Sequence, residues 1–358
     1  PIDIHCAITM KNKKQKKFNQ LMEQLSKEEF KYTPKEEKEI DWSKYDRAQI
    51  NEINDMLLLI RDSVEEAYQR LGIEELLKKP EPGRPPTNPA ELAKAVLMQQ
   101  YFCVSNRVAE GLVLLFQEKM RIKQSFSYKT IERAYEDPLV TLILREIFRL
   151  TQEPVRDKEH VFAPDGTGLS MSMKQNWEND CRSEKAKKGY EKLIAMVGCT
   201  YKLISAFELA EEPSDNESPY FEPLLVETAN AYTRIDLVPA DAAYISRHNC
   251  DLIASVGAIP RIYPKRGITL KKKGSKAWTE MLLSFIEDPQ EWLREYHPRS
   301  IPESSFSVFK RDYPIPLRRR IKLRRKQEAF TRVCNYNLKR LCYLKYLEGI
   351  TPTDIWNT

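Results

Sequence analysis

Four residues in the last quarter of the chain share a spacing that fits one face of a helix. They are Tyr296, Arg299, Glu303 and Lys310, separated by three, four and seven positions. On a continuous helix, these offsets bring the four side chains within about 60° of one another. One face would then carry a carboxylate among groups that hold phosphates and stack on bases. Pro298 and Pro302 argue against helix through the first half, so we expect the helix to begin near Pro302, with Ser300 as a cap.

Two aspartates follow apolar runs of β type. Asp165 closes the run from Val161 to Ala163 and precedes Gly166-Thr167-Gly168, small residues that leave space for a metal ion or a phosphate. Asp241 follows Leu237-Val238-Pro239-Ala240. It therefore lies at the carboxyl end of an expected strand, where α/β sheets place their sites. A lone aspartate there is more often a turn or cap residue, so the case depends on the acids taken together.

Three acids on separate elements suit the cleavage or joining of a phosphodiester. That reaction requires an activated water or hydroxyl and stabilisation of charge on the leaving oxygen, which two divalent ions about 4 Å apart supply. Magnesium prefers a few carboxylates together with substrate oxygens and water. Asp165, Asp241 and Glu303 would satisfy this requirement if they meet at one edge of a sheet. The expected cofactors are two Mg²⁺ ions, with Mn²⁺ as a substitute.

The residues also carry a family resemblance. Tyr-x2-Arg-x3-Glu-x6-Lys, complete at positions 296–310, resembles the signature of bacterial and archaeal insertion-sequence transposases that have an Asp-Asp-Glu site. The blocks that begin at Asp165 and Asp241 resemble that family's first and second acidic blocks, and residues 259–265 resemble the strand and basic loop that follow. Gly83-Arg84-Pro85-Pro86 resembles the opening of its N-terminal region. The resemblance covers the chain from about residue 82 to residue 339.

The resemblance implies a fold, an activity and residue roles. The fold class would be α/β, with a ribonuclease H-like mixed-sheet catalytic domain preceded by an all-α helical DNA-binding domain. Asp165, Asp241 and Glu303 would bind the catalytic metals, and the other signature residues would contact transposon-end DNA, namely Tyr296, Arg299 and Lys310. The activity would be metal-dependent cleavage at transposon ends and strand transfer into target DNA. The partners would be double-stranded DNA and further copies of the chain, in a homodimer or larger synaptic assembly.

The elements that must position these residues divide the chain into four parts. Residues 1–40 are rich in Lys, Glu and Gln, which predicts a loosely ordered basic arm. Residues 41–150 carry apolar positions at three-to-four-residue intervals, which predicts a helical domain, and the resemblance implies that this domain binds DNA ends. One of its helices should be capped by Asn88. Short β-type runs mixed with helices over residues 151–345 predict the α/β catalytic domain, and residues 346–358 form a C-terminal tail.

Individual elements are predicted as follows. Strands are expected at 161–163, 169–173, 193–199, 203–209, 237–238 and 259–263, and helices at 107–118, 127–136, 221–231 and 246–256.

Positive charge is concentrated in three stretches, Lys11–Lys17, Lys265–Lys276 and Arg318–Lys326, although the net charge is only +6. Clusters of this kind indicate a polyanionic partner. The candidate DNA-binding residues beyond the signature are Arg84, Lys129, Arg133, Lys265, Arg266, Arg318, Arg319 and Arg320. Lys129 and Arg133 would share a helix that could enter a DNA groove. For each cluster, a solvated surface without DNA remains the alternative.

Other features exclude several classes of protein. The longest apolar run, Met56–Ile60, is far below the roughly 20 residues of a membrane helix, and no secretory leader is evident. We therefore expect a cytoplasmic, nucleoid-associated protein of a prokaryotic host. The seven cysteines are scattered and are expected to be reduced, and no Cys or His spacing fits structural zinc.

Two other functions remain open at this point. One is a transposase-derived DNA-binding protein that no longer cuts, although the presence of all three acids argues against it. The other is a ribonuclease H-like endonuclease that only hydrolyses. The sequence does not separate hydrolysis from strand transfer.

Overall fold

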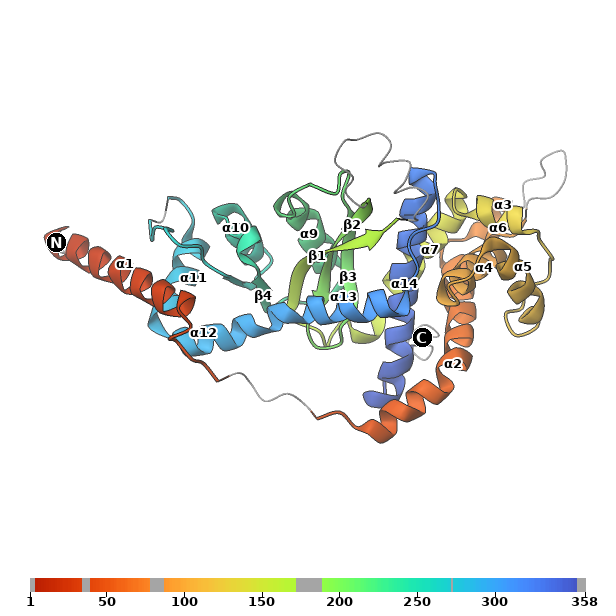
Figure 1. Cartoon of the computed structure of the whole chain (residues 1–358), viewed down its shortest axis with the longest axis horizontal. Helices are drawn as coiled ribbons and strands as arrows, with labels where there is room; N and C mark the ends of the chain where they lie inside the picture. Colours follow the sequence, from red (N-terminus) through yellow and green to blue (C-terminus); the bar gives the residue numbers. More distant parts are fainter. Residues whose placement is uncertain (1–3, 34–38, 78–86, 172–188, 272, 353–358) are drawn as a thin grey trace.

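The structure is a computed structural model that describes residues 4–33, 39–77, 87–171, 189–271 and 273–352. Figure 1 shows a helical region at one end, a sheet with its helices in the middle, and the first helix at the far end. The protein is thus mixed α/β, with a helical N-terminal region and a sheet-containing C-terminal region. No helix within the described ranges is both long and apolar enough to cross a membrane.

The helical region contains six helices within the described residues. They are α2 (Trp42–Arg70), α3 (Ile73–Leu77), α4 (Pro89–Tyr101), α5 (Asn106–Leu115), α6 (Tyr128–Ala134) and α7 (Pro138–Leu150). The predicted cap is confirmed, since the Asn88 side chain accepts a hydrogen bond from the backbone N–H of Ala90 at 2.8 Å. Asp137 caps α7 in the same way. Polar residues followed by proline therefore set the starts of both helices.

The sheet combines antiparallel and parallel pairing. The antiparallel strands β1 (Phe162–Ser170), β2 (Tyr190–Gly198) and β3 (Ile204–Leu209) lie in that order, while β4 (Leu237–Ala240) and β5 (Ile259–Ile262) pair in parallel. A parallel bridge between Val161 and Leu237 brings β4 beside β1. In β2, the consecutive residues Leu193–Val197 are all fully buried, so helices cover both faces of this strand.

The remaining helices surround the sheet. They are α9 (Phe221–Ala231), α10 (Arg247–Ser255), α11 (Lys276–Glu287), α12 (Pro289–Tyr296), α13 (Ile301–Asp312) and α14 (Lys322–Leu347), with short 3₁₀ turns at Ser218–Tyr220 (η2), Ala242–Tyr244 (η3) and His297–Ser300 (η4). The predicted helix at 221–231 is confirmed with its bounds. Helix α9 packs against β2 and β3, whereas α13 packs against β1 and β2.

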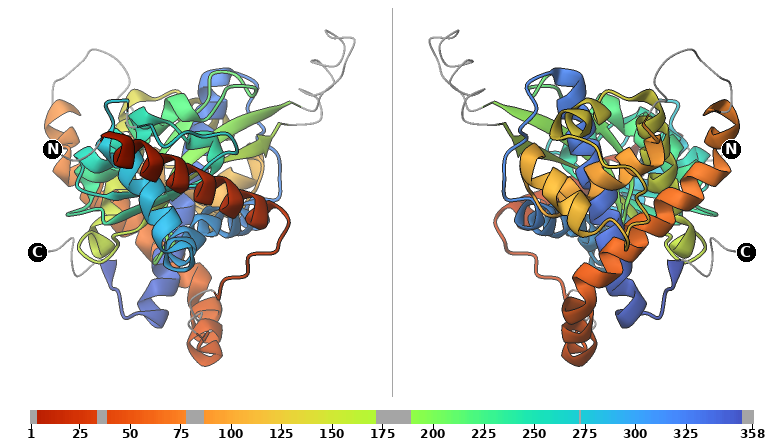
Figure 2. Two further views of the ribbon diagram at one scale, coloured as in Figure 1. Left: turned by 90° about the vertical axis from the view of Figure 1, so that its left-hand side faces the viewer. Right: turned by 90° about the vertical axis from the view of Figure 1, so that its right-hand side faces the viewer.

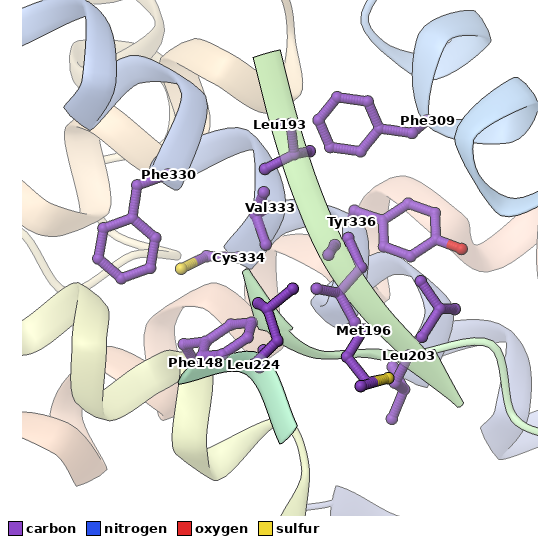
Figure 3. Close-up of a cluster of buried hydrophobic side chains, with 14 of the residues drawn as sticks. Phe148, Leu193, Met196, Leu203, Leu224, Phe309, Phe330, Val333, Cys334 and Tyr336 are labelled. Carbon is purple, nitrogen blue, oxygen red and sulfur yellow. The ribbon is translucent and has the colours of Figure 1, made fainter. Parts of the chain in front are cut away.

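Helix α14 joins the sheet to the helical region. It packs against α2, α4 and α7 as well as against β3. Asn337 in α14 donates to the carbonyl oxygen of Ile204 and accepts from its N–H, both at 2.9 Å, while Asn335 donates to the carbonyl of Leu97 at 2.8 Å. Figure 3 shows side chains of α14 packed between residues of β2, α7 and α9. A single hydrophobic core therefore holds both regions.

The N-terminal residues differ from the expected loosely ordered arm. Residues Ile4–Ser26 form a helix, α1, which lies across α11 (Figure 2, left). Phe18, Leu21 and Met22 are buried at positions i, i+3 and i+4, and the Phe18 ring meets Phe285 of α11 edge-on at 5.9 Å. Five lysines lie along this stretch, but the narrow apolar stripe is sufficient to dock it.

The predicted end of the first strand is also wrong. Strand β1 runs without interruption through Asp165, which pairs with Ala195 in the middle of the strand. We expected separate strands at 161–163 and 169–173 and interpreted Gly166 and Gly168 as space for a metal ion or a phosphate, yet the antiparallel register with β2 continues to Ser170. Continuous pairing with β2 overrides the weak strand preference of the two glycines.

Candidate active site

Asp241 and Glu303 face each other across one guanidinium group. Asp241 follows β4 directly and caps η3, accepting the N–H of Ala242 at 2.5 Å. Arg299 in η4 donates from Nη2 to Asp241 Oδ2 at 3.1 Å and from Nη1 to Glu303 Oε1. The structure therefore brings together the second and third predicted acids, which lie 62 positions apart in sequence (303 − 241).

The helix that carries Glu303 begins where we predicted: α13 starts at Ile301, with Pro302 in its first turn and Ser300 at the N-cap position, although the Ser300 side chain makes no capping hydrogen bond. Helix α12, the 3₁₀ turn η4 and α13 follow one another without a break and form one long rod (Figure 1). Pro298 and Pro302 each lie in the first turn of their own segment, where the missing N–H costs no internal hydrogen bond. The 3₁₀ turn thus lets the chain stay helical through both prolines and places Arg299 one turn before Glu303.

Asp165 lies on the neighbouring strand, beside β4. Burial, together with the negative charges of Glu217 and Glu303, raises the pKa of its carboxyl to about 6, against the opposing effects of the N–H of Gly166 and the charge of Arg299. The first acid is therefore within electrostatic range of the pair that Arg299 bridges. A carboxyl in this setting is destabilised by its own charge and would be stabilised by a nearby cation.

We expect Asp165→Asn to stabilise the protein at pH 8. The folded-state pKa of Asp165 lies above its ordinary value of 3.8, so stability is highest below about pH 4 and falls as pH rises through about 6. An asparagine avoids the buried charge and can still accept the N–H of Gly166. Chemical denaturation without metal should show a gain of about 1–3 kcal/mol at pH 8 and little at pH 4. The exposed control Asp157→Asn should show no such pH dependence; an equal gain at both pH values would contradict the burial argument.

The donor set suits a hard divalent cation. The candidate ligands are carboxylate oxygens, which Mg²⁺ and Mn²⁺ prefer, and the side chains of Asp241 and Glu303 are 47% and 54% exposed. Arg299 already places a positive charge between these two carboxylates. Among the described residues, however, no three His, Cys, Asp or Glu side chains gather closely enough to hold a metal ion. The residues fit such an ion in chemistry and charge, and Arg299 would have to move to admit it.

A fourth carboxylate, Glu217, belongs to the same cluster and was missed from the sequence. It lies just before η2, and a Cβ atom added at Gly166 would meet its Oε1 atom at 2.3 Å. It accepts the hydroxyl of Tyr244 at 2.8 Å and pairs with Lys192 at 3.1 Å. No motif or spacing marks Glu217. The one sequence feature that points to it is Gly166, because a glycine next to Asp165 leaves space for the side chain of another residue.

The remaining signature residues occupy different environments. Tyr296 is partly buried, stacks on Trp292 with ring centroids 5.4 Å apart and contacts Tyr263 at 5.3 Å. Burial raises the pKa of its hydroxyl. Lys310 is exposed in the last turn of α13. Tyr296 thus presents a partly buried ring near Arg299. Lys310 presents an exposed positive charge further along the rod.

The other candidate DNA-binding residues divide by exposure. The exposed ones are Lys129 and Arg133 on α6, Lys265 and Arg266 after β5, and Arg318 and Arg320 before α14. Arg319 is 7% exposed, donates to Gln99 Oε1 at 2.9 Å, and lies 4.1 Å from the ring centre of Tyr135. Its burial corrects our grouping of the three arginines, because Arg319 joins the chain before α14 to the helical region. Arg84 lies outside the described residues.

We expect Arg319→Ala to destabilise the protein, unlike its neighbour. Losing the buried guanidinium removes one of the two hydrogen bonds that Gln99 Oε1 accepts and the contact with the Tyr135 ring, a loss of about 2–4 kcal/mol. Thermal unfolding should show a lowered Tm, whereas Arg318→Ala should leave Tm nearly unchanged and instead flatten the salt dependence of DNA binding by about one phosphate contact. Equal Tm values for the two variants would refute the structural role of Arg319.

Comparison with known proteins gives two matches. Residues 156–338 match the family model described as the transposase DDE domain. This range contains β1, the sheet, Asp165, Asp241, Glu303 and most of α14. The probable transposase for insertion sequence element ISA1214 of Archaeoglobus fulgidus is 27% identical over 270 residues, which cover 74% of this chain and 78% of that protein.

Proposed function

This chain belongs to the family of transposases with a DDE domain, and from that premise we propose that it cleaves phosphodiesters at transposon ends and transfers the freed strand into target DNA. The observation that carries the proposal is the junction made by Arg299. It connects the acid at the end of β4 to the acid on α13, beside the buried acid of β1. Two of the three carboxylates share Arg299, and the third, Asp165, lies within electrostatic range of Arg299 and Glu303.

The pairing pattern supports a ribonuclease H-like catalytic domain. Three antiparallel strands continue into two parallel strands, with β1 in the middle of the order 3-2-1-4-5. Asp165 on the central strand and Asp241 at the end of its neighbour then lie at adjacent positions. This arrangement is the mixed sheet that the sequence resemblance implies.

Asp165, Asp241 and Glu303 would hold two Mg²⁺ ions, or Mn²⁺ as a substitute. Such ions stabilise charge on the attacking and leaving oxygens of a phosphodiester. Arg299 would exchange its carboxylate partners for a phosphate of the DNA, which a guanidinium binds with two parallel hydrogen bonds. Tyr296 would offer its ring edge to a base or sugar, and Lys310 would bind a phosphate further along the strand.

The partners proposed are double-stranded DNA, at the transposon ends and the target, and a second or further copies of this chain. The exposed cations that would contact DNA include Lys129, Arg133, Lys265, Arg266, Arg318 and Arg320, with Arg84 as a further candidate. We place the protein in the cytoplasm, associated with the nucleoid.

Product analysis tests the reaction. Water would attack the phosphorus at the transposon end and break its bond to the 3′ oxygen, leaving a 3′-hydroxyl. That hydroxyl would attack a target phosphate and displace a target 3′ oxygen, so labelled end DNA should become joined to a circular target. Nicked ends without joined products would favour the purely hydrolytic nuclease. Specific end binding without nicking would favour the catalytically silent DNA-binding protein.

A further inference from the structure

Glu217 lies where three parts of the candidate active site meet. Its carboxylate touches Gly166, the residue after Asp165, closely enough that no Cβ fits there. The same carboxylate accepts a hydrogen bond from the hydroxyl of Tyr244 in η3. It also forms an ion pair with Lys192 on β2. One side chain therefore contacts the strand of the first acid and the turn that follows the second.

Tyr244 connects this contact to Asp241. It is 1% exposed and ends η3, the turn that Asp241 caps, and its N–H donates to the Asp241 carbonyl at 3.0 Å. Its own carbonyl accepts from Asn249 at 2.7 Å, which anchors the turn to α10. With the ring buried and the backbone tied at both ends, the position of the Tyr244 hydroxyl is coupled to that of the Asp241 backbone.

Lys192 offsets the negative charge of Glu217 and holds the loop that carries Asp215 and Glu217. Its ammonium group pairs with Glu217 and also donates to the carbonyl of Asp215 at 2.8 Å. Lys192 itself stands opposite Gly168 in the β1 and β2 register. Lys192 thus places a positive charge against a carboxylate that is only 22% exposed and lies next to the acids of the site.

We propose that Glu217 is a positioning residue, which acts through Gly166 and Tyr244 to hold the Asp241 turn at a fixed place beside Asp165. The proposal rests on the proposed function, since it concerns how two of its acids are held. Supporting groups of this kind generally change metal affinity or rate by about 10–100-fold when they are removed. Among the described residues, the hydrogen-bond and ion-pair partners of the Glu217 carboxylate are Tyr244 and Lys192 and not Asp241 or Glu303, so its effect is indirect.

Three variants of the full-length protein separate positioning from a purely structural role. Glu217→Ala removes both contacts, Tyr244→Phe removes only the hydroxyl, and Glu217→Gln keeps the shape and an oxygen that can accept from Tyr244. Glu212→Ala, an exposed residue of the same loop, is the control. Three quantities are measured for each variant. Electron paramagnetic resonance gives Mn²⁺ binding without DNA. Single-turnover kinetics at saturating end DNA give the cleavage rate, and titration in Ca²⁺ gives the DNA affinity.

The expected pattern is specific. Glu217→Ala and Tyr244→Phe should weaken Mn²⁺ binding and slow cleavage by about 10–100-fold, with DNA affinity within about threefold of the unchanged protein. Their double variant should be no worse than Glu217→Ala alone, because both break one link. Glu217→Gln should recover most of the loss, and Glu212→Ala should resemble the unchanged protein.

Two outcomes overturn the inference in distinguishable ways. If the unchanged protein binds Mn²⁺ and cleaves DNA but Tyr244→Phe keeps both within threefold, the positioning role is wrong and the proposed function stands. This variant decides the matter even if Glu217→Ala fails to fold. If the unchanged protein neither binds Mn²⁺ nor cleaves end DNA, the proposed function is wrong, and the positioning role of Glu217 is wrong as well.

Discussion

Replacing Asp241 with asparagine should lower the rate of cleavage at transposon ends by at least about 10³-fold, because a divalent ion at this site supplies several kcal/mol of charge stabilisation. Asp241 lies at the end of β4 with its side chain 47% exposed, free to exchange Arg299 for another cation. DNA binding should persist, because the substitution removes a negative charge that repels the phosphates of the DNA. Single-turnover cleavage of labelled end DNA gives the rate, and gel-shift titration in Ca²⁺ gives the affinity.

A nearby aspartate provides the matched control. Asp236 precedes β4, pairs with Arg234 and has a side chain that is 50% exposed, so it resembles Asp241 in exposure and pairing but lies at the other end of the strand. Asp236→Asn should cleave at the rate of the unchanged protein. If Asp241→Asn also cleaved at that rate, Asp241 would be an ordinary turn residue and the three acids would not form one site.

Removing Arg299 should move metal binding and cleavage in opposite directions. Its guanidinium joins Asp241 to Glu303, so a divalent ion must compete with it. Arg299→Ala should therefore bind Mn²⁺ about tenfold more tightly in the absence of DNA, a gain of about 1.4 kcal/mol. Cleavage should nevertheless fall about 10²-fold, because the guanidinium would no longer hold a phosphate.

The comparison with lysine separates charge from geometry. Arg299→Lys keeps the positive charge but loses the planar fork that reaches two carboxylates or two phosphate oxygens at once. Its Mn²⁺ affinity should lie between those of the unchanged protein and Arg299→Ala, and its cleavage should stay well below normal. Weaker Mn²⁺ binding in Arg299→Ala would show that Arg299 supports the metal site instead of competing with it.

Much of the secondary structure follows from local patterns in the sequence. The helix at Phe221–Ala231 and the strand pair at β4 and β5 appear where apolar spacing and small or polar boundary residues predict them. Asn88 caps α4 because an amide side chain and a following proline together suit a helix start. The approach of Asp241 and Glu303 was predicted only through the resemblance, because nothing local encodes a contact over 62 positions.

The errors arise where tertiary contacts outweigh local preference. Separate strands were expected at 161–163 and 169–173, with Gly166 and Gly168 between them, yet β2 pairs with both glycines in one continuous strand. Pro298 and Pro302 correctly indicate that α13 starts as a separate helix at Ile301, but they do not show that a 3₁₀ turn joins it to α12. Arg319 counts as positive charge in sequence, while Gln99 and Tyr135, both more than 180 positions away, bury it. Such partners are set by the folded core and leave no local trace.

The most direct test of the central claim is cleavage of linear DNA that carries the element's own ends, with Mg²⁺ or Mn²⁺, by the unchanged protein and by Glu303→Gln. The account predicts nicks at the ends that require the metal and disappear in Glu303→Gln, which keeps the shape of the side chain but lowers its charge. Metal-dependent nicking that survives in Glu303→Gln, or tight end binding without cleavage by either protein, would contradict it.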